Sequence, residues 1–209
     1  MTSKQDEQYA RQAEDWTDRA YADVTAYLEH RADLIGSLGP QLEPRDEILD
    51  LACGDAGLGQ ALLDRGFRYR GVDSTPEMVE SARRRLAERA TIELGDLNEY
   101  RPPSPVAATT VFRAIYYARD RRVFFARVLG YSEKKLVFDL NPRQYRVDDV
   151  VGDLQAAGFG SIELRPFFVP QTIVLPRPLL AAAKAFEGSG PLARLALRVR
   201  FTYLVAASR

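Results

Sequence analysis

The sequence predicts an α/β fold: a doubly wound, mostly parallel sheet of seven strands, with an N-terminal helical segment and a helical insertion before the last strand. The chain has 209 residues, of which 46% are apolar and 28% charged, as in a globular domain with a sizeable core. Short apolar runs alternate with helical patterns along most of the chain. We see no internal repeat or linker, so we expect a single domain over residues 1–209.

The first half of the chain shows a helix and then alternating strands and helices. Apolar residues recur at three- and four-residue spacing in the N-terminal segment, which predicts a helix. Pro76 suits the first position of a later helix, because its missing N–H is unpaired there in any case. The expected elements are a helix over about 8–38, a strand at 47–52, a turn and a helix to about 65, a strand at 68–73, a helix at 76–89 and a strand at 91–96.

The second half continues the alternation. Its first strand is apolar throughout, which is typical of the middle of a covered parallel sheet. About 30 residues before the last strand interrupt the pattern, and we expect them to form a helical insertion over 170–200. The expected strands are 106–115, 135–140, 161–169 and 201–207, and the expected helices are 120–129, 147–157, 179–186 and 192–199.

Charge and composition exclude several classes of protein. The longest uncharged stretches, such as 102–112, are about half the roughly 20 apolar residues that a membrane-spanning helix needs. The single Cys53 cannot form an internal disulfide and the first residues lack an apolar core, so we expect a cytoplasmic protein. Residues 1–100 hold 21 acids and 12 bases, and residues 101–209 hold 8 acids and 17 bases, which suits an anionic partner. The sequence contains no basic run with interleaved aromatic residues, which argues against binding to nucleic acid.

Three acidic residues lie at or near the ends of consecutive strands. Residues 52–57 have a glycine spacing that lets backbone amides approach a ligand at the start of a helix. Asp50 lies two residues before this turn, where a carboxylate would repel a pyrophosphate but attract a cation. Asp73 ends the second strand, where a carboxylate binds ribose hydroxyls, and Asp96 ends the third. The pattern favours a ligand with a ribose, an adenine and a positive charge.

Residues 48–57, 71–78 and 95–97 resemble the successive motifs of class I S-adenosylmethionine-dependent methyltransferases. The resemblance extends over about 8–170 and 201–209. It implies a Rossmann-like methyltransferase fold, S-adenosylmethionine as cofactor, and transfer of its methyl group to a small-molecule acceptor by in-line displacement. The family usually has glycine at the positions of Ala52 and Ala56.

The resemblance also implies which residues hold the cofactor and the acceptor. In the family the glycine turn surrounds the methionine part, the acid after the second strand binds ribose, and residues after the third flank adenine. The implied cofactor residues are Asp50, Ala52, Gly54, Gly57, Asp73, Ser74, Met78, Asp96, Leu97, Arg113 and, from the N-terminal segment, Tyr9 and Trp16. Tyr116 and Tyr117 are expected between cofactor and acceptor, and Asn141 and Tyr145 on the same rim as substrate residues. We predict no metal site. We assign a catalytic role to no residue, including the sole histidine, His30.

Several alternatives remain open. A nicotinamide-dependent Rossmann oxidoreductase would use the same glycine spacing, although Asp50 and Asp96 count against it. A non-catalytic protein that binds S-adenosylmethionine would keep Asp73. We expect residues 1–40 to form a helical cap. The insertion at 170–200 is interpreted as a lid over an apolar or anionic acceptor, or as a surface for peripheral lipid contact.

Overall fold

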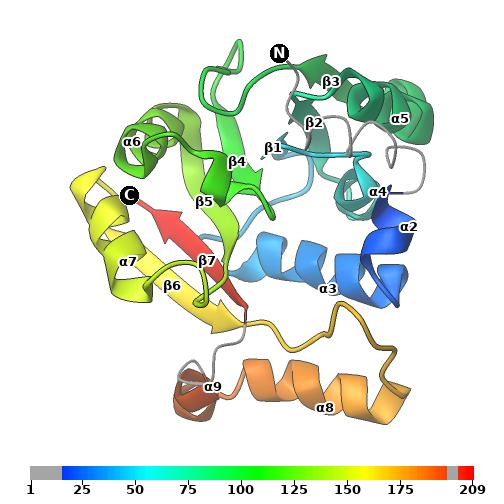
Figure 1. The fold of residues 1–209 in the computed structure, drawn as a ribbon, viewed down its shortest axis with the longest axis vertical. Coiled ribbons are helices and arrows are strands. Elements are labelled where there is room, and N and C mark those ends of the chain that lie inside the picture. The colour runs from blue at the N-terminus through cyan, green and yellow to red at the C-terminus, as the bar shows by residue number, and fades with distance from the viewer. Residues whose placement is uncertain (1–15, 197–201) are drawn as a thin grey trace.

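A seven-stranded mixed sheet forms the centre of the molecule (Figure 1). The structure is a computed structural model that describes residues 16–196 and 202–209. The strand order is β3-β2-β1-β4-β5-β7-β6, with only β7 antiparallel to its neighbours, which confirms the doubly wound prediction. The strands are β1 (Glu47–Leu51), β2 (Arg68–Asp73), β3 (Thr91–Leu94), β4 (Val106–Val111), β5 (Ser132–Leu140), β6 (Ser161–Pro166) and β7 (Tyr203–Ser208).

Helices cover both faces of the sheet because side chains alternate between its faces along each strand. The α-helices are α2 (Trp16–Ala20), α3 (Val24–Ser37), α4 (Gly57–Leu63), α5 (Pro76–Leu86), α6 (Arg121–Tyr131), α7 (Val147–Ala156), α8 (Arg177–Glu187) and α9 (Pro191–Ala196). In β1, Ile48 packs in the cluster that contains residues of α3, α4 and α5, whereas Leu49 packs in the cluster that contains residues of α6 and α7.

The predicted N-terminal helix over 8–38 is wrong at residues 21–23, where the chain breaks between α2 and α3. Asp23 causes the break, since its side chain accepts a hydrogen bond from the backbone N–H of Ala26 at 2.9 Å and caps α3. The break lets α2 turn away from α3 and cross the glycine turn. Residues 8–15 of the predicted helix lie outside the described part of the chain.

The predicted fourth strand is also too long. It ends at Val111 instead of residue 115, and residues 115–117 form a short 3-10 helix. Arg113, between the two, has a φ of 55°, which a strand cannot contain. The chain therefore leaves the sheet early and carries residues 112–117 across the strand ends.

The helical insertion is present as α8, which lies beyond α3 from the sheet, and α9, which contacts β6 at the edge of the sheet (Figure 1). Glu187 at the end of α8 is buried and bonded to the ring of His30 on α3, and it accepts the backbone N–H of Phe168 at 2.5 Å. Much of the rest of α8 is exposed, including Leu179 and Phe186. The buried polar contact of Glu187 is thus one of the attachments of the insertion, beside the hydrogen bonds of Gln171 to Ala20 and Ala22 and the packing of Leu180 on the core.

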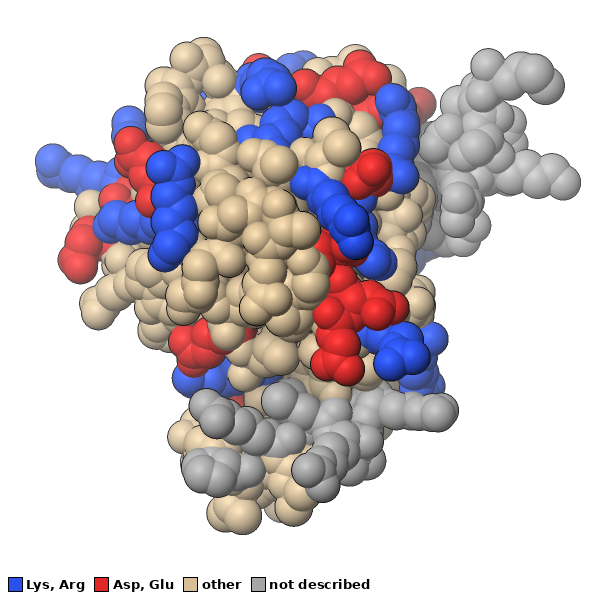
Figure 2. Space-filling model, turned by 90° about the vertical axis from the view of Figure 1, so that its left-hand side faces the viewer, with Lys and Arg blue, Asp and Glu red and all other residues tan. Residues whose placement is uncertain are grey.

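No helix in the described ranges is long and apolar enough to cross a bilayer. On the face shown in Figure 2, acidic and basic side chains are intermixed around an uncharged central area. This face therefore presents no field of one sign.

Candidate functional site

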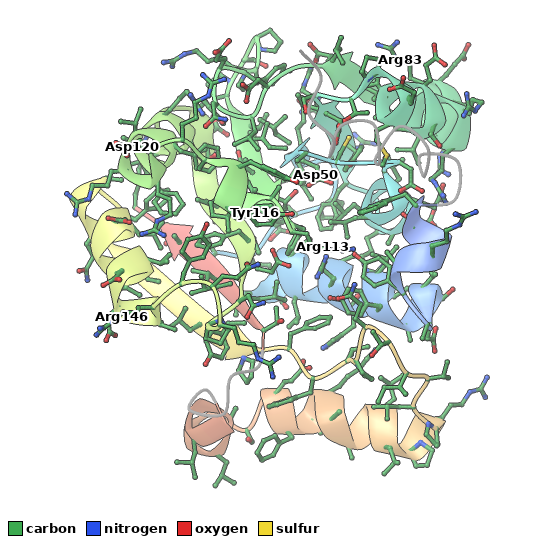
Figure 3. All side chains as sticks on the ribbon, in the orientation of Figure 1. Asp50, Arg83, Arg113, Tyr116, Asp120 and Arg146 are labelled. Carbon is green, nitrogen blue, oxygen red and sulfur yellow. The ribbon has the colours of Figure 1, made fainter. Side chains whose placement is uncertain are left out.

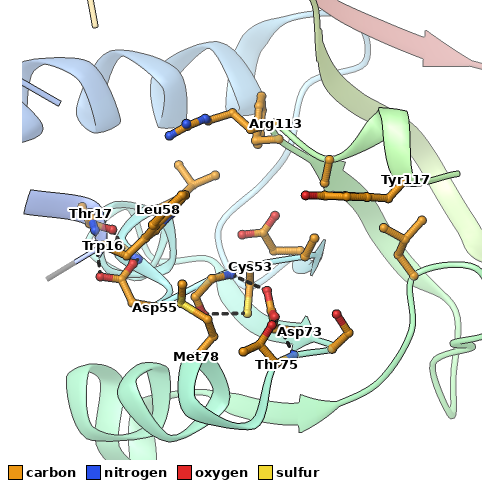
Figure 4. A pocket seen from close by; sticks show the side chains of 18 of the residues that line it. Trp16, Thr17, Cys53, Asp55, Leu58, Asp73, Thr75, Met78, Arg113 and Tyr117 are labelled. Carbon is orange, nitrogen blue, oxygen red and sulfur yellow. Dashed lines mark hydrogen bonds between the residues drawn. The ribbon is translucent and has the colours of Figure 1, made fainter. Parts of the chain in front are cut away.

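A cavity of about 460 Å³ opens at the carboxyl ends of β1, β2 and β4, where the strand order reverses (Figures 3 and 4). Ligands of doubly wound sheets bind at this position, and the volume is that of a small-molecule pocket. Most of the predicted site residues meet here. Its walls include Trp16, Asp50, Ala52, Gly54, Gly57, Asp73, Ser74, Met78, Asp96, Leu97, Arg113, Tyr116 and Tyr117.

The turn between β1 and α4 has a backbone that glycine normally supplies. Ala52, Gly54 and Ala56 all have φ close to +58°, in the left-handed region. This conformation costs an L-residue about 1–2 kcal/mol. The two alanines therefore keep the backbone path of a glycine turn and carry its strain, so the departure of the sequence from the family pattern leaves the turn intact.

Asp73 connects this turn to the end of β2. Its Oδ2 accepts the backbone N–H of Gly54 at 2.8 Å, and its Oδ1 accepts the backbone N–H of Thr75 at 2.9 Å. Burial raises the pKa of the Asp73 carboxyl, while these amides oppose the shift. Each oxygen of a carboxylate has two lone pairs, so Asp73 keeps acceptor capacity for hydroxyl groups in the cavity.

Asp50 lies beneath the turn and is 3% exposed. Tyr69 donates its hydroxyl to Oδ2 at 2.8 Å and Thr110 donates to Oδ1 at 2.7 Å. Burial raises the pKa of Asp50 to about 6, because desolvation penalises its charged form. A cationic ligand in the cavity would favour the charged carboxylate.

Asp96 and Leu97 follow β3 at the opposite end of the cavity. Asp96 Oδ1 accepts the backbone N–H of Asn98 at 2.8 Å, and Arg119 donates to Oδ2 at 2.6 Å. Leu97 and Met78 are buried and supply apolar wall. This end suits a flat ring with polar edges.

Asp55, in the glycine turn, is a site residue that the sequence analysis missed. It is 1% exposed and binds the backbone N–H of Thr17 at 3.1 Å, the hydroxyl of Thr17, and the guanidinium of Arg85 at 2.7 Å. A Cβ on Gly57 would lie 2.3 Å from Thr17 Oγ1, so α2 rests directly on the turn. The position of Asp55 just before a helix gave only a weak indication of a role at the site. Its partner Thr17 lies 38 residues earlier in the chain, so local spacing could not reveal the contact.

The residues expected near the acceptor divide into two groups. Tyr116 and Tyr117 line the cavity, with ring centroids 4.3 Å apart. Asn141 and Tyr145 are not among its wall residues. The carbonyl of Asn141 accepts backbone N–H groups in the turn that follows β5, and the ring of Tyr145 lies under the Arg121 guanidinium, 4.7 Å from its Cζ.

The remaining residues and segments singled out in the sequence either lie outside the described residues or show no catalytic arrangement. Tyr9 lies outside the described residues. Cys53 lines the cavity, but burial raises the pKa of its thiol well above the usual value, which leaves it a weak nucleophile. His30 is bonded to Glu187 and is not a wall residue. No described residue of the 170–200 insertion lines the cavity, and no group of three metal-ligating side chains occurs in the described ranges.

Sequence comparison identifies a related domain within the chain. Residues 48–131 match the family model described as "Methyltransferase domain". A Geobacillus thermodenitrificans (strain NG80-2) protein, described as an uncharacterized methyltransferase, is 29% identical over 126 residues. This match covers 58% of the present chain and 56% of that protein, so the chain matches about half the length of this relative.

Solved structures extend the likeness to nearly the whole chain. A TehB-like S-adenosylmethionine-dependent methyltransferase from Corynebacterium glutamicum has a TM-score of 0.65 at 19% identity over 98% of both chains. A chain from the complex of the Haloferax volcanii Trm112 methyltransferase activator with a protein named as a methyltransferase has a TM-score of 0.67 at 21% identity over 96% of both. Such low identities establish the fold. Residues 48–131 thus resemble a methyltransferase domain in sequence, and the chain has the fold of the class I S-adenosylmethionine-dependent methyltransferases.

Proposed function

We propose that the chain binds S-adenosylmethionine in this cavity and transfers its methyl group to a small-molecule acceptor. One observation supports the proposal above all others. The acids Asp50, Asp73 and Asp96, which follow the sequence motifs at three strand ends, line one cavity around the glycine turn. A cation that carries a ribose and an adenine fits this arrangement.

The donor set of the cavity matches the parts of the cofactor. Asp73 would accept hydrogen bonds from the ribose hydroxyls, because its carboxylate lines the cavity at the end of β2. Asp96 and Leu97 would flank the adenine. The turn from Ala52 to Gly57 would surround the methionine part, with Asp50 compensating the positive charge.

Bound S-adenosylmethionine supplies an electrophilic methyl group on a positively charged sulfur. The work of the chain is then to orient the acceptor in line and to exclude water. The rings of Trp16, Tyr116 and Tyr117 form walls for this purpose, and α2 closes the cavity over the glycine turn. The wall contains no histidine, so we assign no general base.

Calorimetric titration tests the cofactor assignment. We expect micromolar binding of S-adenosylmethionine and S-adenosylhomocysteine, and at least a tenfold loss in Asp73→Ala, since each lost hydrogen bond to a charged group is worth about 1.5–3 kcal/mol. Asp148→Ala, which removes an exposed acid on α7, is the matched control and should bind as the wild type does. Binding of nicotinamide dinucleotides alone, or equal affinity in Asp73→Ala, would contradict the proposal. Binding without transfer to a panel of small alcohols, amines and acids would favour a non-catalytic protein.

A further inference from the structure

Arg31 on α3 is a buried cation without a carboxylate at hydrogen-bond distance. Its side chain lines the cavity and is 2% exposed. Nη2 donates to the hydroxyl of Tyr27 at 2.8 Å, and burial raises the pKa of Tyr27 to about 12, so this partner is a neutral phenol. Asp139 Oδ2 lies 3.8 Å from Nη2, beyond hydrogen-bond distance. Arg31 Nε has no hydrogen-bond partner in the described structure.

Arg113 supplies a second guanidinium to the same cavity (Figures 3 and 4). Its Nη1 is buried and, within the described residues, also has no hydrogen-bond partner. The Cζ atom lies 5.3 Å from the centre of the Trp16 ring. The residue is held at a φ of 55° while its backbone N–H donates to Asp139 Oδ1 at 2.7 Å. Non-glycine residues with such strain cluster at ligand sites.

Asp139 is the only acid that the described contacts place near either guanidinium. Its Oδ1 accepts the backbone N–H of Arg113, and its Oδ2 forms a long ion pair of 3.8 Å with Arg31, so neither guanidinium has a carboxylate at hydrogen-bond distance among the described contacts. Buried cations are normally paired with anions, and buried N–H groups normally have a hydrogen-bond partner. The rings of Phe112 and Tyr27, 4.2 and 4.7 Å from Arg31 Cζ, stabilise the charge in part but accept no strong hydrogen bond.

We infer that Arg31 and Arg113 form an anion subsite that binds a carboxylate group of the methyl acceptor. The inference rests on the proposed function and names its substrate class: a small monocarboxylic acid with an aromatic or apolar body, which the rings of Phe112, Tyr116 and Tyr117 would contact. Guanidinium groups bind carboxylates through two parallel N–H bonds.

The charges of the cofactor argue that it does not fill this subsite. S-adenosylmethionine carries an ammonium and a sulfonium beside one carboxylate, so its net charge is positive and an acidic surrounding suits the molecule as a whole. The acids that suit a cation, Asp50 and Asp73, lie at the strand ends around the glycine turn. The cavity thus has an acidic part for the cofactor and a basic part for an anionic acceptor.

The test uses benzoate as the probe and benzamide as its neutral analogue. Each is titrated by calorimetry into the full-length protein, with and without saturating S-adenosylhomocysteine. We expect benzoate to bind at least ten times more tightly than benzamide, and Arg31→Met to remove this preference. Arg31→Lys, which keeps the charge but loses the two parallel donors, should show an intermediate preference. Arg127→Met is the matched control, because Arg127 also has an unpaired buried Nε in the described structure but is not a wall residue.

Several results would overturn the inference. Equal binding of benzoate and benzamide to the wild type would show that aromatic rings alone satisfy Arg31. Sulfate binding as tight as that of benzoate would assign the pair to inorganic oxyanions. If Arg31→Met weakened S-adenosylhomocysteine but not 5′-methylthioadenosine, which lacks the amino-acid end, the guanidinium would belong to the cofactor carboxylate. Failure of S-adenosylhomocysteine to bind would refute the proposed function alone, because the benzoate titration without it still tests the subsite.

Discussion

Replacing Asp55 with asparagine should release α2 from the glycine turn. The carboxylate accepts two bonds from Thr17 and one from Arg85, and asparagine keeps its size but loses its charge. Hydrogen bonds to a charged group are worth about 1.5–3 kcal/mol each, but asparagine retains one acceptor and Arg85 is partly exposed to water. The net loss in the contact between α2 and the turn is therefore about 2–4 kcal/mol, which shifts the opening equilibrium of α2 by about 30- to 1000-fold.

Trp16, the sole tryptophan of the chain, reports on this contact directly. Its ring lies 3.4 Å from the position of a Cβ on Gly54, so detachment of α2 would move it from the turn into water. We expect Asp55→Asn to shift the fluorescence of Trp16 to the red, to increase its quenching by acrylamide, and to speed hydrogen exchange at the amide of Thr17. Asp64→Asn removes an exposed acid at the other end of α4 and should change none of these. Unchanged quenching in Asp55→Asn would refute the idea that Asp55 holds α2 in place.

Three further perturbations test other parts of the structure. The pKa of Asp50 is raised to about 6 in the folded chain, so the folded state binds the proton of this carboxyl more tightly than the unfolded state does. The free energy of unfolding should therefore fall by about 2–3 kcal/mol as the pH rises from about 4 to 6. Urea unfolding measured across this pH range should show a flatter profile for Asp50→Asn. Ala52→Gly should raise the free energy of unfolding by up to about 1 kcal/mol, whereas Ala82→Gly, inside α5, should lower it by about 1 kcal/mol or more. Glu187→Ala should cost about 2–3 kcal/mol and expose α8 to hydrogen exchange, because it leaves His30 and a backbone N–H without their partner.

Each of these three predictions has an outcome that would contradict it. An identical pH profile in Asp50→Asn would show that another group titrates in this range. Equal destabilisation by the two glycine variants would mean that Ala52 is not strained. Unchanged exchange of α8 in Glu187→Ala would show that the apolar contacts of the insertion, not the buried polar contact, hold it to the domain.

Much of the site could be predicted because many of its residues lie at or just after the carboxyl ends of strands. A strand that ends in an acid places that acid at the edge of the sheet, and carboxyl ends of parallel strands meet at one edge. The sequence therefore places Asp50, Asp73 and Asp96 together, beside the turn that follows β1. Asn141 and Tyr145 show the limit of the same reasoning: they follow a strand end, yet they are not among the cavity walls.

The fold class and the acidic part of the cavity follow from the sequence, since hydrophobic periodicity and motif spacing act over a few residues. The contact of α2 with Asp55, the bond of α8 to His30, and the place of Asp139 between the Arg31 guanidinium and the Arg113 backbone emerge only in the folded chain. Each of these contacts joins residues 26 to 157 positions apart, and several involve buried charged side chains. Their geometry follows from the packing of whole helices on the sheet, which no local pattern of residues encodes.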